Sequence, residues 1–132
     1  MERTNVERIR SDRAPAPIGP YSQAIGTHDI VFCSGQIPID PTTGKLVEGD
    51  VAAQAARALD NVSAVLEAAN LGLGDVVKTT LFLVDMGDFA AVNAVYGERL
   101  GDAAPARSTV AVAGLPLGAR VEIDAIALRR SH

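Results

Sequence analysis

The sequence is poor in aromatic residues and cysteine, which limits both its core and its chemistry. It has no tryptophan, aromatic residues make up 4% of the chain, and Cys33 is the single cysteine. One cysteine cannot form an intrachain disulfide, and with His28 as the only internal histidine no spacing typical of a zinc site exists. Hydrophobic residues still make up 48% of the 132 residues, which predicts one globular domain, residues 1–132, with an aliphatic core.

Long apolar runs and blocks of positive charge are also absent. No stretch approaches the ~18 apolar residues that a membrane span needs, and no basic segment followed by an apolar run opens the chain as in a signal peptide. The formal net charge is −4 and the pI is near 5.0, so the surface should repel phosphate backbones. We therefore expect a cytoplasmic protein that binds neither membranes nor nucleic acid, and the missing zinc-site spacing predicts that it holds no metal.

Two helices are predicted from apolar residues that recur three and four positions apart. The first covers about 50–70, with Asp50 as its N-cap, and the second covers about 88–100, with Asp88 as its N-cap. Gly101 directly follows the second helix, where helices commonly end.

Strands are predicted from β-branched and alternating segments. They cover 22–27, 30–36, 76–84, 108–113 and 121–128, with a further edge strand at 4–9. The segment 114–118, Gly-Leu-Pro-Leu-Gly, has hairpin-turn chemistry and predicts that the last two strands pair with each other. The result is an α+β fold.

The last predicted strand indicates that the protein is a homo-oligomer. Two helices cover only one face of a sheet of five or six strands. On the strand 121–128, Val121, Ile123, Ala125 and Ala127 point to one face, and the residues that point to the other are Glu122, Asp124, Ile126 and Leu128. Two carboxylates mixed with two large apolar side chains suit a subunit interface with a polar pocket better than an open surface.

Arg107 and Glu122 are the polar residues whose strand positions need an explanation. Arg107 opens a Val-rich strand, where it is either an edge arginine with its head in solvent or an anion clamp, since a guanidinium matches a carboxylate bidentately. Glu122 lies within a strand, and two interpretations are open for it. It could form a structural ion pair, with either Arg107 or Arg120. Alternatively, burial could raise the pKa of its carboxyl so that it transfers protons near neutral pH. Cys33, in an apolar strand, is interpreted as a core residue.

Five motifs in order give the chain a family resemblance from residue 16 to residue 129. They are Ile-Gly-Pro-Tyr-Ser-Gln at 18–23, Ser-Gly-Gln-Ile-Pro at 34–38, Asp-Phe-Ala-Ala-Val-Asn at 88–93 followed by Tyr96, Pro-Ala-Arg-Ser at 105–108, and Val-Glu-Ile-Asp-Ala-Ile-Ala at 121–127. In these motifs the chain resembles the RidA/YjgF family of reactive intermediate deaminases.

The resemblance implies a fold, an assembly and an activity. The fold is chorismate-mutase-like: a mixed sheet with two helices on one face, assembled as a homotrimer with active sites between neighbouring subunits. The implied activity is that of a 2-iminobutanoate/2-iminopropanoate deaminase, which hydrolyses reactive enamines and imines to 2-keto acids and ammonia without a cofactor.

The resemblance also implies roles for individual residues. Arg107 would bind the substrate carboxylate, and Glu122 would position and activate the attacking water. The other residues implied to contact the substrate are Tyr21, Ser34, Gly35, Asn93 and Thr109. Many relatives have cysteine in place of Thr109, a change of little consequence if only the backbone there contacts the ligand.

Two other functions stay open at this point. One is a non-catalytic regulator or chaperone-like protein that binds small carboxylates in the same cleft. The other is an endoribonuclease, an activity described for some members of the family. The acidic pI and the lack of aromatic residues interleaved with basic ones argue against the second.

Overall fold

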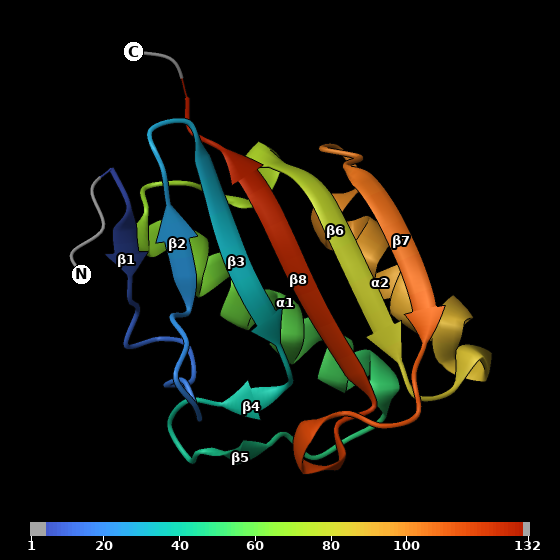
Figure 1. Cartoon of the computed structure of the whole chain (residues 1–132). Coiled ribbons are helices and arrows are strands. Elements are labelled where there is room, and N and C mark those ends of the chain that lie inside the picture. Colours follow the sequence, from blue (N-terminus) through green and yellow to red (C-terminus); the bar gives the residue numbers. More distant parts are fainter. Residues whose placement is uncertain (1–4, 131–132) are drawn as a thin grey trace.

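A computed structural model describes residues 5–130, and a six-stranded mixed sheet lies at its centre (Figure 1). The strands in spatial order are β1 (Glu7–Ile9), β2 (Ala24–Gly26), β3 (Ile30–Gln36), β8 (Val121–Leu128), β6 (Val76–Leu83) and β7 (Ala106–Ala111). Only β6 and β7 are parallel among these neighbours. A separate two-stranded ribbon is formed by β4 (Ile39–Asp40) and β5 (Lys45–Leu46).

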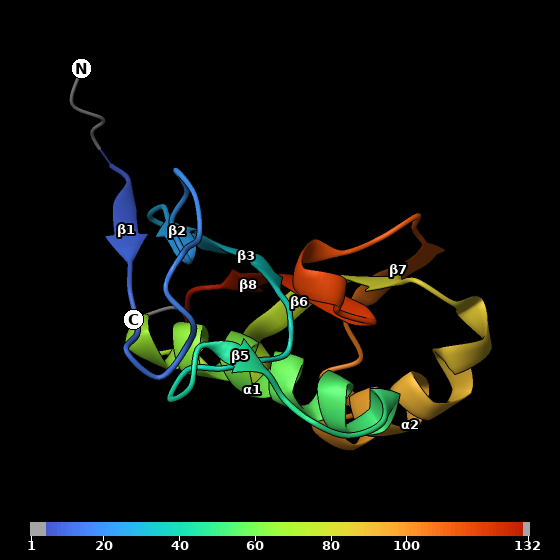
Figure 2. The ribbon, with the colours of Figure 1, turned by 90° about the horizontal axis from the view of Figure 1, so that it is seen from below.

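Two helices, α1 (Val51–Ala68) and α2 (Phe89–Leu100), pack against one face of the sheet, as the sequence predicts (Figure 2). Asp50 caps α1 by accepting the N–H of Ala53 at 2.9 Å. Asp88 is the N-cap residue of α2, as predicted, but its side chain forms no capping hydrogen bond. Its carboxylate instead pairs with Arg120 at 2.9 Å, because a short 3₁₀ turn, η2 (Met86–Asp88), leads directly into the helix. No helix within residues 5–130 is long and apolar enough to cross a membrane.

The core lies between the helices and the sheet, and β8 supplies much of it. Val121 and Ile123 of β8 are fully buried, as are Leu59 of α1 and Leu81 of β6. Side chains of β8 alternate between buried and half-exposed, which confirms the two faces predicted for this strand. We call the sheet face away from the helices the open face; it carries the side chains of Phe32, Ser34, Phe82, Glu122, Asp124 and Ile126.

The predicted pairing of the last two strands is wrong, because β6 lies between β7 and β8. Two parallel strands need a long crossover connection, and α2 provides it between β6 and β7. This crossover places β7 at the edge of the sheet, next to β6. The segment after β7 then passes through the 3₁₀ turn η3 (Pro116–Gly118) and returns antiparallel to β6 on its other side. β8 therefore lies in the centre of the sheet, paired with β3 on one edge and with β6 on the other.

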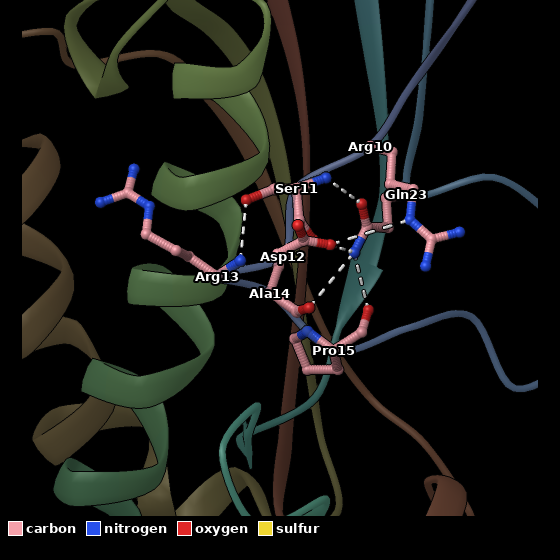
Figure 3. Close-up of polar contacts among 7 residues, drawn as sticks. All are labelled: Arg10, Ser11, Asp12, Arg13, Ala14, Pro15 and Gln23. Atoms are coloured by element: carbon pink, nitrogen blue, oxygen red, sulfur yellow. Dashed lines mark hydrogen bonds and ion pairs between the residues drawn. The ribbon is translucent and has the colours of Figure 1, made fainter.

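A buried glutamine fixes the chain between β1 and β2. Gln23 is 3% exposed, and its side-chain oxygen accepts the N–H of Ser11 at 2.6 Å. Its amide nitrogen donates to the carbonyls of Ser11, Ala14 and Pro15 at 3.0, 3.3 and 2.8 Å (Figure 3). These bonds close the loop that carries Tyr21. The predicted strand 22–27 is shorter in the structure, and that at 4–9 begins at Glu7, with residue 4 outside the described residues.

Candidate active site

Arg107 lies at the edge of the sheet, and neighbouring side chains hold its head group. It is paired in register with Thr79 of β6, whose side chain is buried on the helix side. Its Nη1 donates to Oδ1 of Asn93 at 2.7 Å. Its Cζ lies 4.8 Å from the ring centroid of Tyr96 and 5.4 Å from that of Phe89. The side chain is therefore exposed, as an edge arginine would be, but it is also oriented by cation–π contacts and one hydrogen bond.

The two rings below Arg107 were not anticipated as parts of a site. Tyr96 is 7% exposed, and its hydroxyl is 2.7 Å from Oγ1 of the buried Thr79. Phe89, Asn93 and Tyr96 follow the i, i+4, i+7 spacing of one helix face. An aromatic–amide–aromatic pattern at this spacing, next to a strand that opens with arginine, is the signal that could have identified them.

Glu122 lies on the open face of the sheet, opposite Phe82 of β6. Partial burial raises the pKa of its carboxyl above the ordinary value, and the negative charge of Asp124 raises this pKa further. Neither ion pair considered for Glu122 forms within the described chain, since Arg120 pairs with Asp88 and Arg107 bonds to Asn93. A carboxyl of this kind can exchange a proton closer to neutral pH than an exposed glutamate.

Gly35 gives the Glu122 carboxylate room to lie flat against β3. A Cβ atom placed on Gly35 would lie 2.8 Å from Cδ of Glu122 and 3.1 Å from its Cγ, and it would collide with Oε2. Next to it, Ser34 donates its hydroxyl to the carbonyl of Ser22 at 2.6 Å. Any larger residue at position 35 would push the end of the Glu122 side chain away from β3.

A cavity of about 580 Å³ opens on the same face beside Ser34. Tyr21 lies on its wall and is 49% exposed, and the phenol oxygen accepts the N–H of Ile18 at 3.4 Å. The remaining lining comes from Arg8, Gly19, Pro20, Ser22 and Ile25. The structure thus brings Tyr21, Ser34, Gly35 and Glu122 to one face of the sheet.

The other candidate residues lie on the opposite side. Thr109 is paired with the buried Leu81, so it shares the helix side of β7 with Arg107 and its partner Asn93. Side chains of adjacent paired residues point to the same face of a sheet. Arg107 and Glu122 of one chain therefore face away from each other and cannot contact the same small ligand.

Other polar groups give no sign of a separate catalytic centre. Burial, with a smaller effect of Asp124, raises the pKa of the Cys33 thiol to about 12, and the residue is 7% exposed. Its interpretation as a core residue is confirmed. His28 lies in an exposed turn. In the part of the chain that the structure describes, no three His, Cys, Asp or Glu side chains are grouped so that they could hold a metal ion.

Comparison with known proteins identifies similar chains of the same length. The sequence profile of the family described as Endoribonuclease L-PSP matches residues 11–129. Protein DfrA of Myxococcus xanthus is 53% identical over 130 residues, which are 97% of this chain and 99% of the relative. The 2-iminobutanoate/2-iminopropanoate deaminase of Escherichia coli K12 is 51% identical over 125 residues, 92% of this chain and 97% of the relative.

A solved structure shows the same fold with a ligand. The crystal structure of E. coli TdcF with bound serine superposes with a TM-score of 0.89 at 44% sequence identity. The match covers 94% of this chain and 99% of TdcF.

Proposed function

The chain belongs to the Endoribonuclease L-PSP family, also called the RidA/YjgF family, and on that basis we propose that it hydrolyses 2-imino acids to 2-keto acids and ammonia. The observation that carries the proposal is the oriented guanidinium of Arg107, held by Asn93 and by the Tyr96 ring at an exposed sheet edge. A fixed guanidinium is well suited to bind a carboxylate through two parallel hydrogen bonds. The names of the E. coli deaminase and of TdcF with bound serine support a small amino-acid-like ligand.

We infer that two copies of the chain complete each site. Arg107 and Glu122 face opposite sides of the sheet, so a ligand that touches both must lie between subunits. One copy would contribute Arg107, Asn93 and Thr109, and the neighbouring copy Tyr21, Ser34, Gly35 and Glu122. Phe32 and Leu128, 45% and 47% exposed, leave apolar surface on or at the end of the open face that suits burial in a homotrimer.

In the proposed reaction, Arg107 binds the substrate carboxylate and aligns C2 of the imine with a water molecule. The Glu122 carboxylate removes a proton from this water as its oxygen bonds to C2, the C=N electron pair moves to the nitrogen, and Glu122 passes the proton to that nitrogen to give a carbinolamine. Glu122 then removes the remaining hydroxyl proton and delivers it to the amino nitrogen as the C–N bond breaks, so that the oxygen forms the keto group and ammonia leaves. The imine carbon is already electrophilic, so the proposal needs only alignment and proton transfer.

A coupled assay tests the activity. A serine dehydratase releases 2-aminoacrylate, and the formation of pyruvate is followed with and without the protein. We expect the protein to accelerate pyruvate release and Arg107→Ala to lose at least about 100-fold of this acceleration. Arg99→Ala is the matched control, because Arg99 lies on the same helix as Asn93 but pairs with Asp60 at 2.7 Å. Full activity of the Arg107→Ala variant would contradict the proposal.

Mixing two inactive variants tests the shared site. Chains carrying Arg107→Ala and chains carrying Glu122→Gln are unfolded together and reassembled in equal amounts. If each site takes one residue from each of two copies, about a quarter of the sites combine an intact Arg107 with an intact Glu122, and a corresponding fraction of the activity returns. A mixture that stays as inactive as its components would place both residues in one subunit and refute the shared site.

The family description favours a second candidate, an endoribonuclease. Cleavage of RNA that persists through repurification and that Glu122→Gln removes would support this function. Tight binding of pyruvate without imine turnover would support the regulator or chaperone-like alternative.

A further inference from the structure

Arg8 is a positive charge that the described chain leaves without a partner. Each of the other arginines between residues 5 and 130 contacts a carboxylate or an amide oxygen, as Arg10 does with Asp12 at 4.0 Å and Arg129 with Glu7 at 2.8 Å. The side chain of Arg8 forms neither an ion pair nor a hydrogen bond with any residue in that range. A guanidinium offers five donors, so its natural ligand is an anion.

The position of Arg8 connects this charge to the proposed active site. Arg8 is paired with Ile25 and Ile25 with Phe32, which places Arg8 on the open face of the sheet together with Glu122. The cavity of about 580 Å³ has Arg8 on one wall and Ser34 on another. The residue after Ser34 is Gly35, which the Glu122 carboxylate closely approaches, so the cavity lies beside the proposed active site.

The cavity extends beyond the residues next to Glu122, and its charge is unbalanced. Its lining reaches from Ser34 to Arg8, whereas 2-iminopropanoate carries only a methyl group beyond its reacting carbon. No carboxylate is among the lining residues, so Arg8 is the one charged group there. The Tyr21 hydroxyl accepts a backbone N–H, which leaves its own hydrogen free to donate to a ligand.

We propose that Arg8 and this cavity form a subsite for a second carboxylate, so that the protein accepts 2-imino dicarboxylic acids. The inference rests on the proposed function. The first carboxylate of such a substrate binds Arg107 of one copy, and the second extends along the open face of the neighbouring copy to Arg8 and Tyr21. Arg8 thus determines specificity and takes no part in the proton transfers at Glu122.

The backbone on both sides of the cavity is held in place, which a selective subsite requires. β1 is paired with β2 through Arg8 itself. The segment after β1 is fixed by the four hydrogen bonds of Gln23, which also closes the loop that carries Tyr21 (Figure 3). Arg10, labelled in the same view, lines a smaller adjoining pocket of about 150 Å³ together with Arg8 and Tyr21, so it is not an independent control. Arg99 pairs with Asp60 at 2.7 Å and lines neither pocket, so it offers the control.

The test compares one imine with a neutral side chain and one with an acidic side chain. Amino-acid oxidases produce them from L-alanine and L-aspartate in the presence of catalase, and pyruvate and oxaloacetate release are measured. We expect Arg8→Gln to lower kcat/KM about tenfold for the aspartate-derived imine, through KM, and less than twofold for the alanine-derived imine. Arg99→Gln should change neither value by more than about twofold, because Arg99 pairs with Asp60 and does not line the cavity.

Each other outcome has a definite meaning. Equal effects of Arg8→Gln on both imines, or no effect on either, would overturn the subsite. Dissociation of the Arg8→Gln oligomer in light scattering would also overturn it, because Arg8 would then bind a neighbouring copy. Wild-type protein that hydrolyses the alanine-derived imine and not the aspartate-derived one would refute the subsite alone. Failure with both imines would refute the proposed function itself.

Discussion

Replacing Gly35 by alanine should remove catalysis while leaving the fold intact. The added Cβ would stand 2.8 Å from Cδ of Glu122, whereas two carbon atoms are in favourable contact at about 3.5–4.0 Å. The Glu122 carboxyl must therefore retreat by about 1 Å. Because the clash involves the far end of a flexible side chain on the open face, the side chain can move without displacing the backbone of β3.

The expected effects on activity and on stability differ in size. A displacement of about 1 Å in a catalytic group costs about 100-fold in rate, which corresponds to about 2.7 kcal/mol in the activation free energy. The free energy of unfolding should change by no more than about 1 kcal/mol, since alanine restricts the unfolded chain and partly offsets the strain.

The measurement pairs two assays on two glycine variants. Imine hydrolysis is followed by pyruvate release, and stability is followed by urea unfolding. Gly72→Ala is the control, because a Cβ there meets nothing within 4 Å and its φ of −137° suits any residue. If Gly35→Ala keeps more than about a third of the wild-type kcat, or if both glycine variants lose activity equally, the close approach of Glu122 to Gly35 is not what catalysis requires.

The remaining predictions concern Tyr96, Glu122 with its neighbour Asp124, and Cys33. Tyr96→Leu should raise KM about tenfold with a smaller change in kcat, because the ring that holds the Arg107 guanidinium is lost. Tyr96→Phe keeps a ring and should restore most of the affinity. Equal kinetics of the two variants would contradict this role of the ring. In a pH–rate profile, activity should fall as Glu122 becomes protonated, and because its pKa is raised the fall should begin at a higher pH than for an ordinary glutamate. The contribution of Glu122 to stability changes in the opposite direction. Because the pKa of Glu122 is higher in the folded chain than in the unfolded chain, the folded chain keeps the carboxyl proton to a higher pH. The free energy of unfolding therefore decreases as the pH rises from the unfolded-state pKa through the folded-state pKa. An Asp124→Asn variant should shift the acid limb of the profile to lower pH, and an unchanged limb would exclude the charge of Asp124 as a cause. Cys33, with a pKa raised to about 12 and little exposure, should react with iodoacetamide at pH 8 only as fast as the protein unfolds; rapid labelling of the folded protein would show otherwise.

The sequence was informative where local pattern decides structure. Helix α1 follows from its apolar spacing and from Asp50 as N-cap, and both are local properties. The two faces of β8 follow from strict alternation along the strand. The cap of α2 could not be read in the same way, because the partner of Asp88 is Arg120, which is distant in sequence.

Strand order and the sides on which the candidate residues lie were decided only by the tertiary structure. The turn-like segment 114–118 favoured a hairpin, but pairing in a sheet depends on which edges remain free once the crossover helix α2 has packed. That arrangement inserts β8 between β3 and β6 and so turns Glu122 away from Arg107. From the sequence alone, a basic residue, a carboxyl and the motifs around them were evident. Their separation to opposite faces, and with it the case for a site shared between two copies, depends on contacts between segments far apart in the chain, which no local pattern encodes.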